Sequence, residues 1–286
     1  MRPLMTPRPR LLALDVDGTL LDEKGHLPDA VRDALRQVID SGIEVVLASG
    51  RSLTTIPRFI SLIGRPLGAI CFNGAATLAP DGTLLRLVPL PLPLARQAIH
   101  HLQAAGEEPF VFVHPEQPGD ILARSVSPGS RDYLLNNLTR VTWVASLEEA
   151  LQRPPIEIAS LFREEPRAEQ VVGQLRDILG QEAEVILAYN PQHDYWSVAV
   201  HARAANKGDA LLDYLRWRRI APQEAWAVGD GVNDLAMFAV VGRSFAMGHA
   251  PPQVRAAADE VLPPHTQKGV LPLLRRLMEP DERPSA

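Results

Sequence analysis

At the start of the chain, continuous apolar runs alternate with segments whose apolar residues have helical spacing. RLLALDV (10–16), IEVVLASGR (43–51) and GAICFNGA (68–75) are typical of strands buried on both faces. Residues 28–42 and 54–64 lie between these runs and are predicted to be helices. Strands and helices that alternate through short connections predict an α/β fold with a doubly wound parallel sheet.

The pattern changes near residue 80. TLAPDGTLLRLVPL (77–90) predicts a hairpin that turns at Asp81-Gly82. Strands and helices then mix as far as YWSVAVHA (195–202), whose alternation is typical of a strand. Residues 80–202 are therefore expected to form an inserted α+β domain.

The first pattern then resumes. Residues 206–219 are predicted to be a helix, and EAWAVGDGVND (224–234) a buried strand that ends in carboxylates. Residues 1–79 and 203–286 are accordingly expected to form one core domain around the parallel sheet.

Composition narrows the class of protein. The net charge of −5 argues against a nucleic-acid partner, and 46% hydrophobic with 22% charged residues is ordinary for a globular enzyme. The single cysteine, Cys71, excludes an internal disulfide and favours a reducing cytoplasm. Its place in an apolar run favours a buried structural thiol. No apolar run reaches the ~18 residues of a membrane span.

Four polar clusters fall at or next to the carboxyl ends of the predicted parallel strands, where such sheets bind their ligands. Taken singly, each has a plainer explanation as a turn, a helix cap or a solvated lysine. Their joint occurrence in this order favours one functional site. The clusters are Asp15-Val16-Asp17-Gly18-Thr19, Ser49-Gly50-Arg51, Lys207-Gly208 and Gly229-Asp230-Gly231-Val232-Asn233-Asp234.

The acidic members of the clusters suit phosphoryl transfer. Asp15 and Asp230 follow different strands and can share one Mg²⁺, which prefers carboxylates and offsets their mutual repulsion. The Asp15 carboxylate can attack phosphorus and form an aspartyl phosphate. Asp17 points to the same side if the extended geometry continues, and it can act as general acid and then base.

The other members suit the phosphate group. Ser49 and nearby backbone N–H groups can hold phosphate oxygens at a helix start. Lys207 offers a compact positive charge to the phosphoryl group. Asp234 is expected to hold Lys207 or a metal-bound water, and Asn233 to orient a phosphate or substrate oxygen.

In order and in character, the four clusters resemble the four motifs of the haloacid dehalogenase superfamily. The insert between the second and third clusters, with CFNGA (71–75) before it, is similar to the Cof-type phosphatases, whose α/β cap lies at that position. This resemblance covers the whole chain. It implies a Rossmann-like core, an inserted cap, Mg²⁺ dependence and phosphatase activity on small phosphorylated metabolites.

Carried over residue by residue, the resemblance also implies roles. Asp15 would be the nucleophile and Asp17 the acid/base, and the Asp17 backbone carbonyl would ligate the metal together with Asp15 and Asp230. The phosphate-binding set would be Ser49, Gly50, Lys207 and Asn233, supported by Asp234 and Arg51.

Related activities give three alternatives. Cation-pumping ATPases of the superfamily have a similar GDGVND motif but lack an acid two residues after the nucleophile. Because this chain has Asp17 at that position, a hydrolase is favoured over a pump. A phosphomutase stays open. A phosphometabolite-binding protein without activity is disfavoured, because Asp15 and Asp17 are both intact.

The substrate also stays open among sugar phosphates, nucleotides and cofactor phosphates. NPQHDYW (190–196) carries groups that suit a sugar or base, although a surface loop is the favoured interpretation. The protein is expected to be cytoplasmic, a monomer or homodimer, without nucleic-acid or membrane partners.

Overall fold

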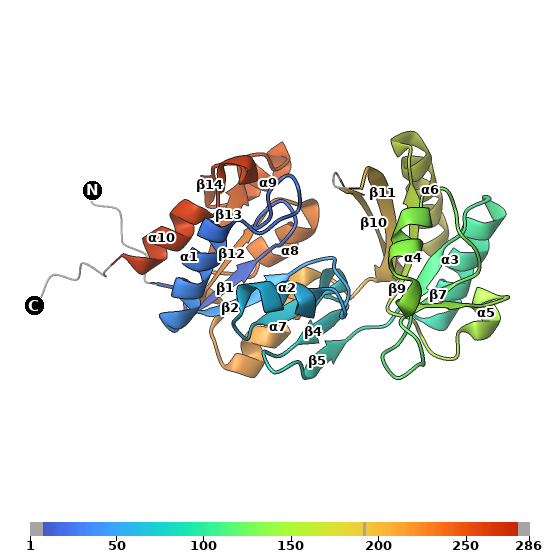
Figure 1. Cartoon of the computed structure of the whole chain (residues 1–286), viewed down its shortest axis with the longest axis horizontal. Coiled ribbons are helices and arrows are strands. Elements are labelled where there is room, and N and C mark those ends of the chain that lie inside the picture. The colour runs from blue at the N-terminus through green and yellow to red at the C-terminus, as the bar shows by residue number, and fades with distance from the viewer. Residues whose placement is uncertain (1–7, 191–192, 280–286) are drawn as a thin grey trace, which may run out of the picture. The chain divides into compact units, whose positions relative to one another are not determined.

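The computed structural model describes residues 8–190 and 193–279, which form two compact units (Figure 1). One unit combines the chain up to Arg86 with the chain from Asn206 onward. The other unit is Leu87–Ala205. No helix in the described ranges is both long and apolar enough to cross a bilayer.

The first unit is built on an eight-stranded sheet in the order β14-β13-β12-β1-β2-β3-β4-β5. Neighbours from β14 to β3 are parallel, and β4 is antiparallel to β3. The predicted parallel sheet is therefore confirmed. Its strands are β1 (Leu11–Leu14), β2 (Glu44–Ala48), β3 (Gly68–Cys71), β4 (Ala76–Leu78), β5 (Leu84–Leu87), β12 (Ala225–Gly229), β13 (Arg243–Met247) and β14 (Glu260–Leu262).

Helices cover this sheet on both faces. They are α1 (Asp29–Asp40), α2 (Ile56–Ile63), α7 (Lys207–Arg218), α8 (Leu235–Phe238), α9 (Pro252–Ala257) and α10 (Leu271–Met278). Leu11 and Ala13 of β1 share a buried cluster with Leu211 of α7. Because strand side chains alternate, Leu12 and Leu14 face the opposite layer, and both are fully buried. Burial on both faces explains why β1 is a continuous apolar run.

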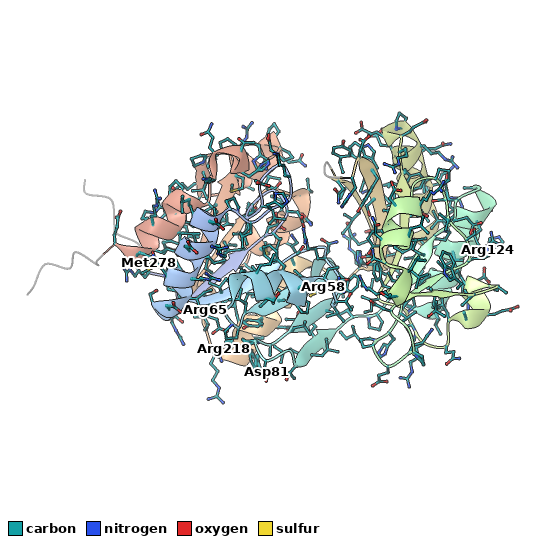
Figure 2. The ribbon with its side chains drawn as sticks, viewed as in Figure 1. Arg58, Arg65, Asp81, Arg124, Arg218 and Met278 are labelled. Carbon is teal, nitrogen blue, oxygen red and sulfur yellow. The ribbon has the colours of Figure 1, made fainter. Side chains whose placement is uncertain are left out.

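The hairpin predicted at 77–90 belongs to this sheet and not to the insert. In its turn, Asp81 (labelled in Figure 2) accepts the backbone N–H of Thr83 at 2.9 Å. β5 is the last strand of the eight-stranded sheet, so strand pairing keeps the hairpin in the core. The insert consequently runs over Leu87–Ala205 instead of the expected 80–202.

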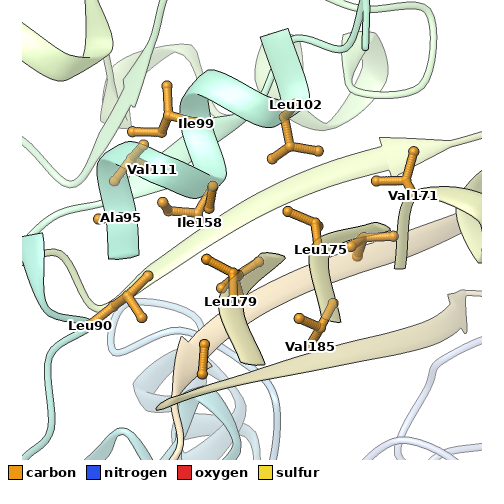
Figure 3. Close-up of a cluster of buried hydrophobic side chains, with 14 of the residues drawn as sticks. Leu90, Ala95, Ile99, Leu102, Val111, Ile158, Val171, Leu175, Leu179 and Val185 are labelled. Atoms are coloured by element: carbon orange, nitrogen blue, oxygen red, sulfur yellow. The ribbon is translucent and has the colours of Figure 1, made fainter. Parts of the chain in front are cut away.

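The second unit is α+β. Its elements are α3 (Leu92–Ala104), β6 (Phe110–Phe112), β7 (Ile121–Ala123), α4 (Arg131–Asn136), β8 (Val141–Trp143), α5 (Leu147–Ala150), β9 (Glu157–Phe162), α6 (Glu165–Leu179), β10 (Ala183–Asn190) and β11 (Tyr195–Ala202). The sheet order is β10-β11-β9-β6-β7-β8, and only β7 and β8 are parallel. Ile99 and Leu102 of α3 and Leu175 of α6 pack on Ile158 and Val185 of the sheet in one cluster (Figure 3).

The NPQHDYW segment joins two strands of this second sheet. Asn190 ends β10 and pairs with Tyr195, which begins β11. The described ends of the segment therefore belong to two antiparallel strands, and the interpretation as a surface loop stays a prediction. Pro191 and Gln192 within it lie outside the described residues.

Cys71 closes β3 and is fully buried. Burial raises the pKa of its thiol to about 12. The structure therefore agrees with the expected structural thiol, because a buried thiol is seldom ionised and only the thiolate is a strong nucleophile.

We expect Cys71 to resist Ellman's reagent in the native protein at about pH 8, because its thiol stays protonated well above that pH. In the unfolded chain its pKa returns to about 8.5, and one thiol should then react. The measurement compares labelling with and without guanidinium chloride. Fast native labelling would contradict the burial.

Candidate active site

Neighbouring strands bring the predicted site residues to one edge of the core sheet. Asp15 directly follows β1, Ser49 follows β2 and Asp230 follows β12. β1 lies between β12 and β2, parallel to both. The carboxyl ends of these three strands therefore meet, as the sequence predicts.

Lys207 is the centre of the buried part of this edge. Its Nζ lies 2.7 Å from Asp15 Oδ1 and 2.6 Å from Asp234 Oδ1, and only 1% of its side chain is exposed. It is the first residue of α7, whose cap Asn206 accepts the backbone N–H of Asp209. A positive charge at this place is unfavourable for the helix, because the helix dipole already has its positive end there. A solvated lysine is therefore the wrong explanation, because this lysine is held inside by two carboxylates.

The pKa values reflect this crowding of charge. Burial raises the pKa of Asp15 well above its ordinary range; Lys207 opposes the shift, and three neighbouring carboxylates add to it. Burial works against a charged Lys207, yet Asp15 and Asp234 raise the pKa of its amine above the ordinary value. The lysine is therefore positively charged at neutral pH, and burial together with the neighbouring carboxylates disfavours the ionised form of Asp15.

Asp230 lies beside the Lys207 cluster. Carboxylate oxygens of Asp15, Asp230 and Asp234 lie within 4.8 Å of one another. Gly18, with a φ of +84°, makes room for Asp230, since a Cβ there would come 2.3 Å from Asp230 Oδ2. Thr19 Oγ1 donates to Asp230 Oδ1 at 3.3 Å. Three clustered carboxylates form a hard, negatively charged donor set that fits a divalent cation such as Mg²⁺.

The contacts of Asp234 occupy both of its carboxylate oxygens. Its Oδ1 accepts from Lys207, and its Oδ2 accepts the backbone N–H groups of Asp230 and Gly231 at 2.9 Å each. Both oxygens are engaged, so the geometry favours the expectation that Asp234 holds Lys207. Asp15 and Asp230 are the residues better placed to hold a metal.

Asp17 lies on the open side of the edge. Its side chain is 52% exposed, and Arg51 donates to both of its carboxylate oxygens at 2.7 and 2.9 Å. The Arg51 guanidinium also lies 5.7 Å from the centre of the Phe59 ring. Arg51 therefore fixes Asp17 next to the buried charges but outside them.

Ser49 is buried, and its Oγ accepts the backbone N–H of Arg51 at 3.1 Å. The helix start expected here is wrong: α2 begins at Ile56, and its cap residue is Thr55. The backbone N–H groups near Ser49 therefore belong to a loop, and they lack the aligned dipole of a helix terminus.

Asn73 is a residue of the site that sequence reasoning missed. Its Oδ1 accepts from Asn233 Nδ2 at 2.8 Å, and its Nδ2 lies next to exposed Gly50. Asn73 and Phe72 have φ values of +54° and +48°, which are strained for residues other than glycine. Strain of this kind collects at functional sites, and the Asn-Gly pair, which follows β3 after one intervening residue, was its available signal.

Replacing Lys207 with Met should lower the free energy of unfolding by about 3 kcal/mol, because two buried carboxylates lose their counter-charge. Urea unfolding followed by circular dichroism in EDTA buffer measures this. Lys24→Met, at an exposed position, is the matched control and should shift it by less than about 0.5 kcal/mol. Equal stability of the two variants would contradict the central place of Lys207.

Comparison with known proteins gives the family. The family model of the haloacid dehalogenase-like hydrolases matches residues 12–274. The phosphatase YwpJ of Bacillus subtilis is 27% identical over 94% of this chain and 100% of its own length. The pyridoxal phosphate phosphatase YbhA of Escherichia coli is 27% identical over 91% of this chain and 96% of its own.

Solved structures agree in fold. A haloacid dehalogenase-like hydrolase from Bacteroides thetaiotaomicron has a TM-score of 0.78 at 21% identity, over 93% of this chain and 98% of its own. A haloacid dehalogenase-like hydrolase from B. subtilis has a TM-score of 0.78 at 23% identity, over 94% of this chain and 99% of its own. The resemblance inferred from the motifs is thus confirmed, and the chain belongs to the haloacid dehalogenase-like hydrolases as a Cof-type enzyme of the phosphatase class.

Proposed function

We propose that the protein is a Mg²⁺-dependent phosphatase that hydrolyses small phosphorylated metabolites through an aspartyl-phosphate intermediate. The observation that carries this proposal is the position of Lys207, with its Nζ within 2.7 Å of carboxylate oxygens of both Asp15 and Asp234 and Asp230 beside them. A charged lysine and clustered acids at one sheet edge suit the transfer of a dianionic group.

Asp15, Asp230 and the backbone carbonyl of Asp17 would hold the metal. When bound, Mg²⁺ draws negative charge from the phosphoryl oxygens and offsets the repulsion among the acids. Ser49, Gly50, Lys207 and Asn233 would hold the phosphate oxygens, with Asn73 fixing the amide of Asn233.

In the first half of the reaction, a carboxylate oxygen of Asp15 attacks phosphorus and the bond from phosphorus to the ester oxygen breaks. Asp17 gives its proton to that leaving oxygen, so an alcohol departs. The half-exposed position of Asp17 suits this exchange, and because both of its oxygens accept from Arg51 in this structure, that contact has to open for one oxygen to carry the proton.

In the second half, water attacks phosphorus and Asp17 takes its proton. The bond between phosphorus and the Asp15 oxygen breaks, which releases phosphate and restores the carboxylate. Lys207 balances the negative charge in both halves without transferring a proton, because its raised pKa keeps it charged.

Residues 87–205 would act as the cap that selects the substrate. The curated relatives include a pyridoxal phosphate phosphatase and HMP-PP phosphatases, and one similar solved structure is a sugar phosphatase. These names support cofactor and sugar phosphates as the first classes to test, with nucleotides next. We also propose that the protein is located in the cytoplasm, because its single cysteine favours a reducing compartment.

Release of inorganic phosphate from a panel of sugar phosphates, nucleotides and cofactor phosphates tests the proposal. With Mg²⁺ we expect turnover of at least one class; EDTA should abolish it, and added Mg²⁺ should restore it. Activity indifferent to EDTA would overturn the metal dependence. Isomerisation of a sugar phosphate without release would instead identify a phosphomutase.

Asp15→Asn should lower turnover by more than about 10³-fold, because an amide cannot form the acyl phosphate. The fold should persist, since the side chains are nearly isosteric. Phosphate release and thermal unfolding are measured together. Asp33→Asn, which alters an exposed surface pair with Arg32, is the matched control and should retain full activity.

Asp17→Asn should slow hydrolysis by about 10²- to 10⁴-fold, the usual contribution of a general acid/base. Because the water of the second half would lack its base, phosphate should stay on the protein. Intact-protein mass spectrometry after rapid quenching detects the added phosphate. An unchanged rate would remove Asp17 from this role.

A further inference from the structure

We propose that His249 is a positioning residue that fixes the Asp230 carboxylate for a divalent cation, and that His265 holds the His249 ring in place. This inference rests on the proposed function, because it takes Asp230 as a metal ligand. Neither histidine belongs to the four sequence clusters.

The sheet order brings His249 to the site. β13 is the parallel neighbour of β12, and Gly229 at the end of β12 pairs with Ala246. Asp230 follows β12 directly, and His249 follows β13 after one intervening residue, so both emerge at the same edge. His265 begins the short 3₁₀ turn His265–Gln267, which follows β14, the next strand along.

The hydrogen bonds of His249 are consistent with one neutral tautomer. Its Nε2 lies 3.3 Å from Asp230 Oδ2, and since a carboxylate only accepts, Nε2 carries the proton and donates. The backbone N–H of His265 lies 3.4 Å from His249 Nδ1, so Nδ1 is the acceptor. Both ring nitrogens therefore have partners, and the contact at Nδ1 helps to set the orientation in which Nε2 faces Asp230.

The ring of His265 packs on the ring of His249. Its Nδ1 is 3.2 Å from His249 Nδ1 and 3.1 Å from His249 Nε2. Near-equal distances to both nitrogens place this atom over the ring and not on the lone-pair axis of either nitrogen. The rings are 4.2 Å apart and inclined at 69°, an edge-to-face contact. The pair therefore stiffens one ring and does not form a two-histidine metal chelate.

Asp230 is held from two sides as a result. Thr19 donates to Oδ1 and His249 donates to Oδ2, each at 3.3 Å. Gly18, which has no side chain, lies next to the same carboxylate. Outer partners of metal ligands are worth about 10- to 100-fold in metal affinity. The side chains of His249 and Asp230 are 28% and 23% exposed, so we expect the lower end, about 10-fold.

Two variants separate hydrogen bonding from packing. His249→Phe keeps an aromatic ring for His265 but removes the donor, whereas His249→Gln keeps a donor and removes the ring. Isothermal titration of Mg²⁺ into the full-length protein gives the affinity without any turnover. We expect His249→Phe to bind about 10-fold more weakly than the wild type, and His249→Gln to bind nearly as well.

His265→Ala should weaken Mg²⁺ binding by a smaller factor, about 3-fold, because the hydrogen bond persists on a less constrained ring. His100→Ala, at an exposed position of α3, is the matched control and should leave the affinity unchanged. Circular dichroism confirms that each variant is folded. If His249→Phe does not fold, His249→Leu takes its place as the variant without a donor.

The outcomes separate this inference from the function beneath it. Wild-type affinity in the donor-free variant, or tighter binding by His249→Phe than by His249→Gln, would overturn the inference and leave the proposed function standing. Failure of the wild type to bind Mg²⁺, with no change on Asp230→Asn, would overturn both.

Discussion

The ammonium group of Lys207 sets the condition that the rest of the site obeys. Burying an ion costs several kcal/mol unless opposite charges and hydrogen bonds replace water. Asp15 and Asp234 meet that condition at 2.7 and 2.6 Å, so the end of β1, the start of α7 and the turn after β12 have to meet at one point. Burial and the neighbouring carboxylates raise the pKa of Asp15, and a bound cation would relieve this crowding, which is the electrostatic basis for expecting one.

The parallel sheet makes this convergence possible. Strands that run in one direction deliver their carboxyl ends to one edge, and the order β13-β12-β1-β2 sets which loops become neighbours. Buried groups such as Lys207 and Asp234 are fixed by charge pairing, while Asp17 stands half-exposed against Arg51. The fixed charges suit binding of a phosphoryl group, and the exposed acid suits exchange of protons with a leaving group and water.

The same order explains the place of the two histidines. β13 lies against β12 on the side away from β1, so His249 reaches Asp230 from the loop after β13, whereas Asp15 follows β1 on the other side of β12. The strands on the two sides of β12 thereby bring different residues to Asp230. Asp15 adds a carboxylate to the cluster, whereas His249 orients the carboxylate of Asp230.

The sequence by itself determined the alternation of strands and helices, the parallel core, the insert and the four polar clusters. These depend on local periodicity and on the rule that parallel strands share an edge. Only the tertiary structure decided that Asp234 accepts a hydrogen bond from Lys207 and that Arg51 pairs with Asp17. It also brought Asn73 to Asn233 and His249 to Asp230. The structure differs from the expectation in two further places: the hairpin at Asp81 belongs to the core sheet, and α2 begins at Ile56. Contacts within the site join residues up to 211 positions apart, and their distances follow from strand order and register, which a pattern along one chain does not carry.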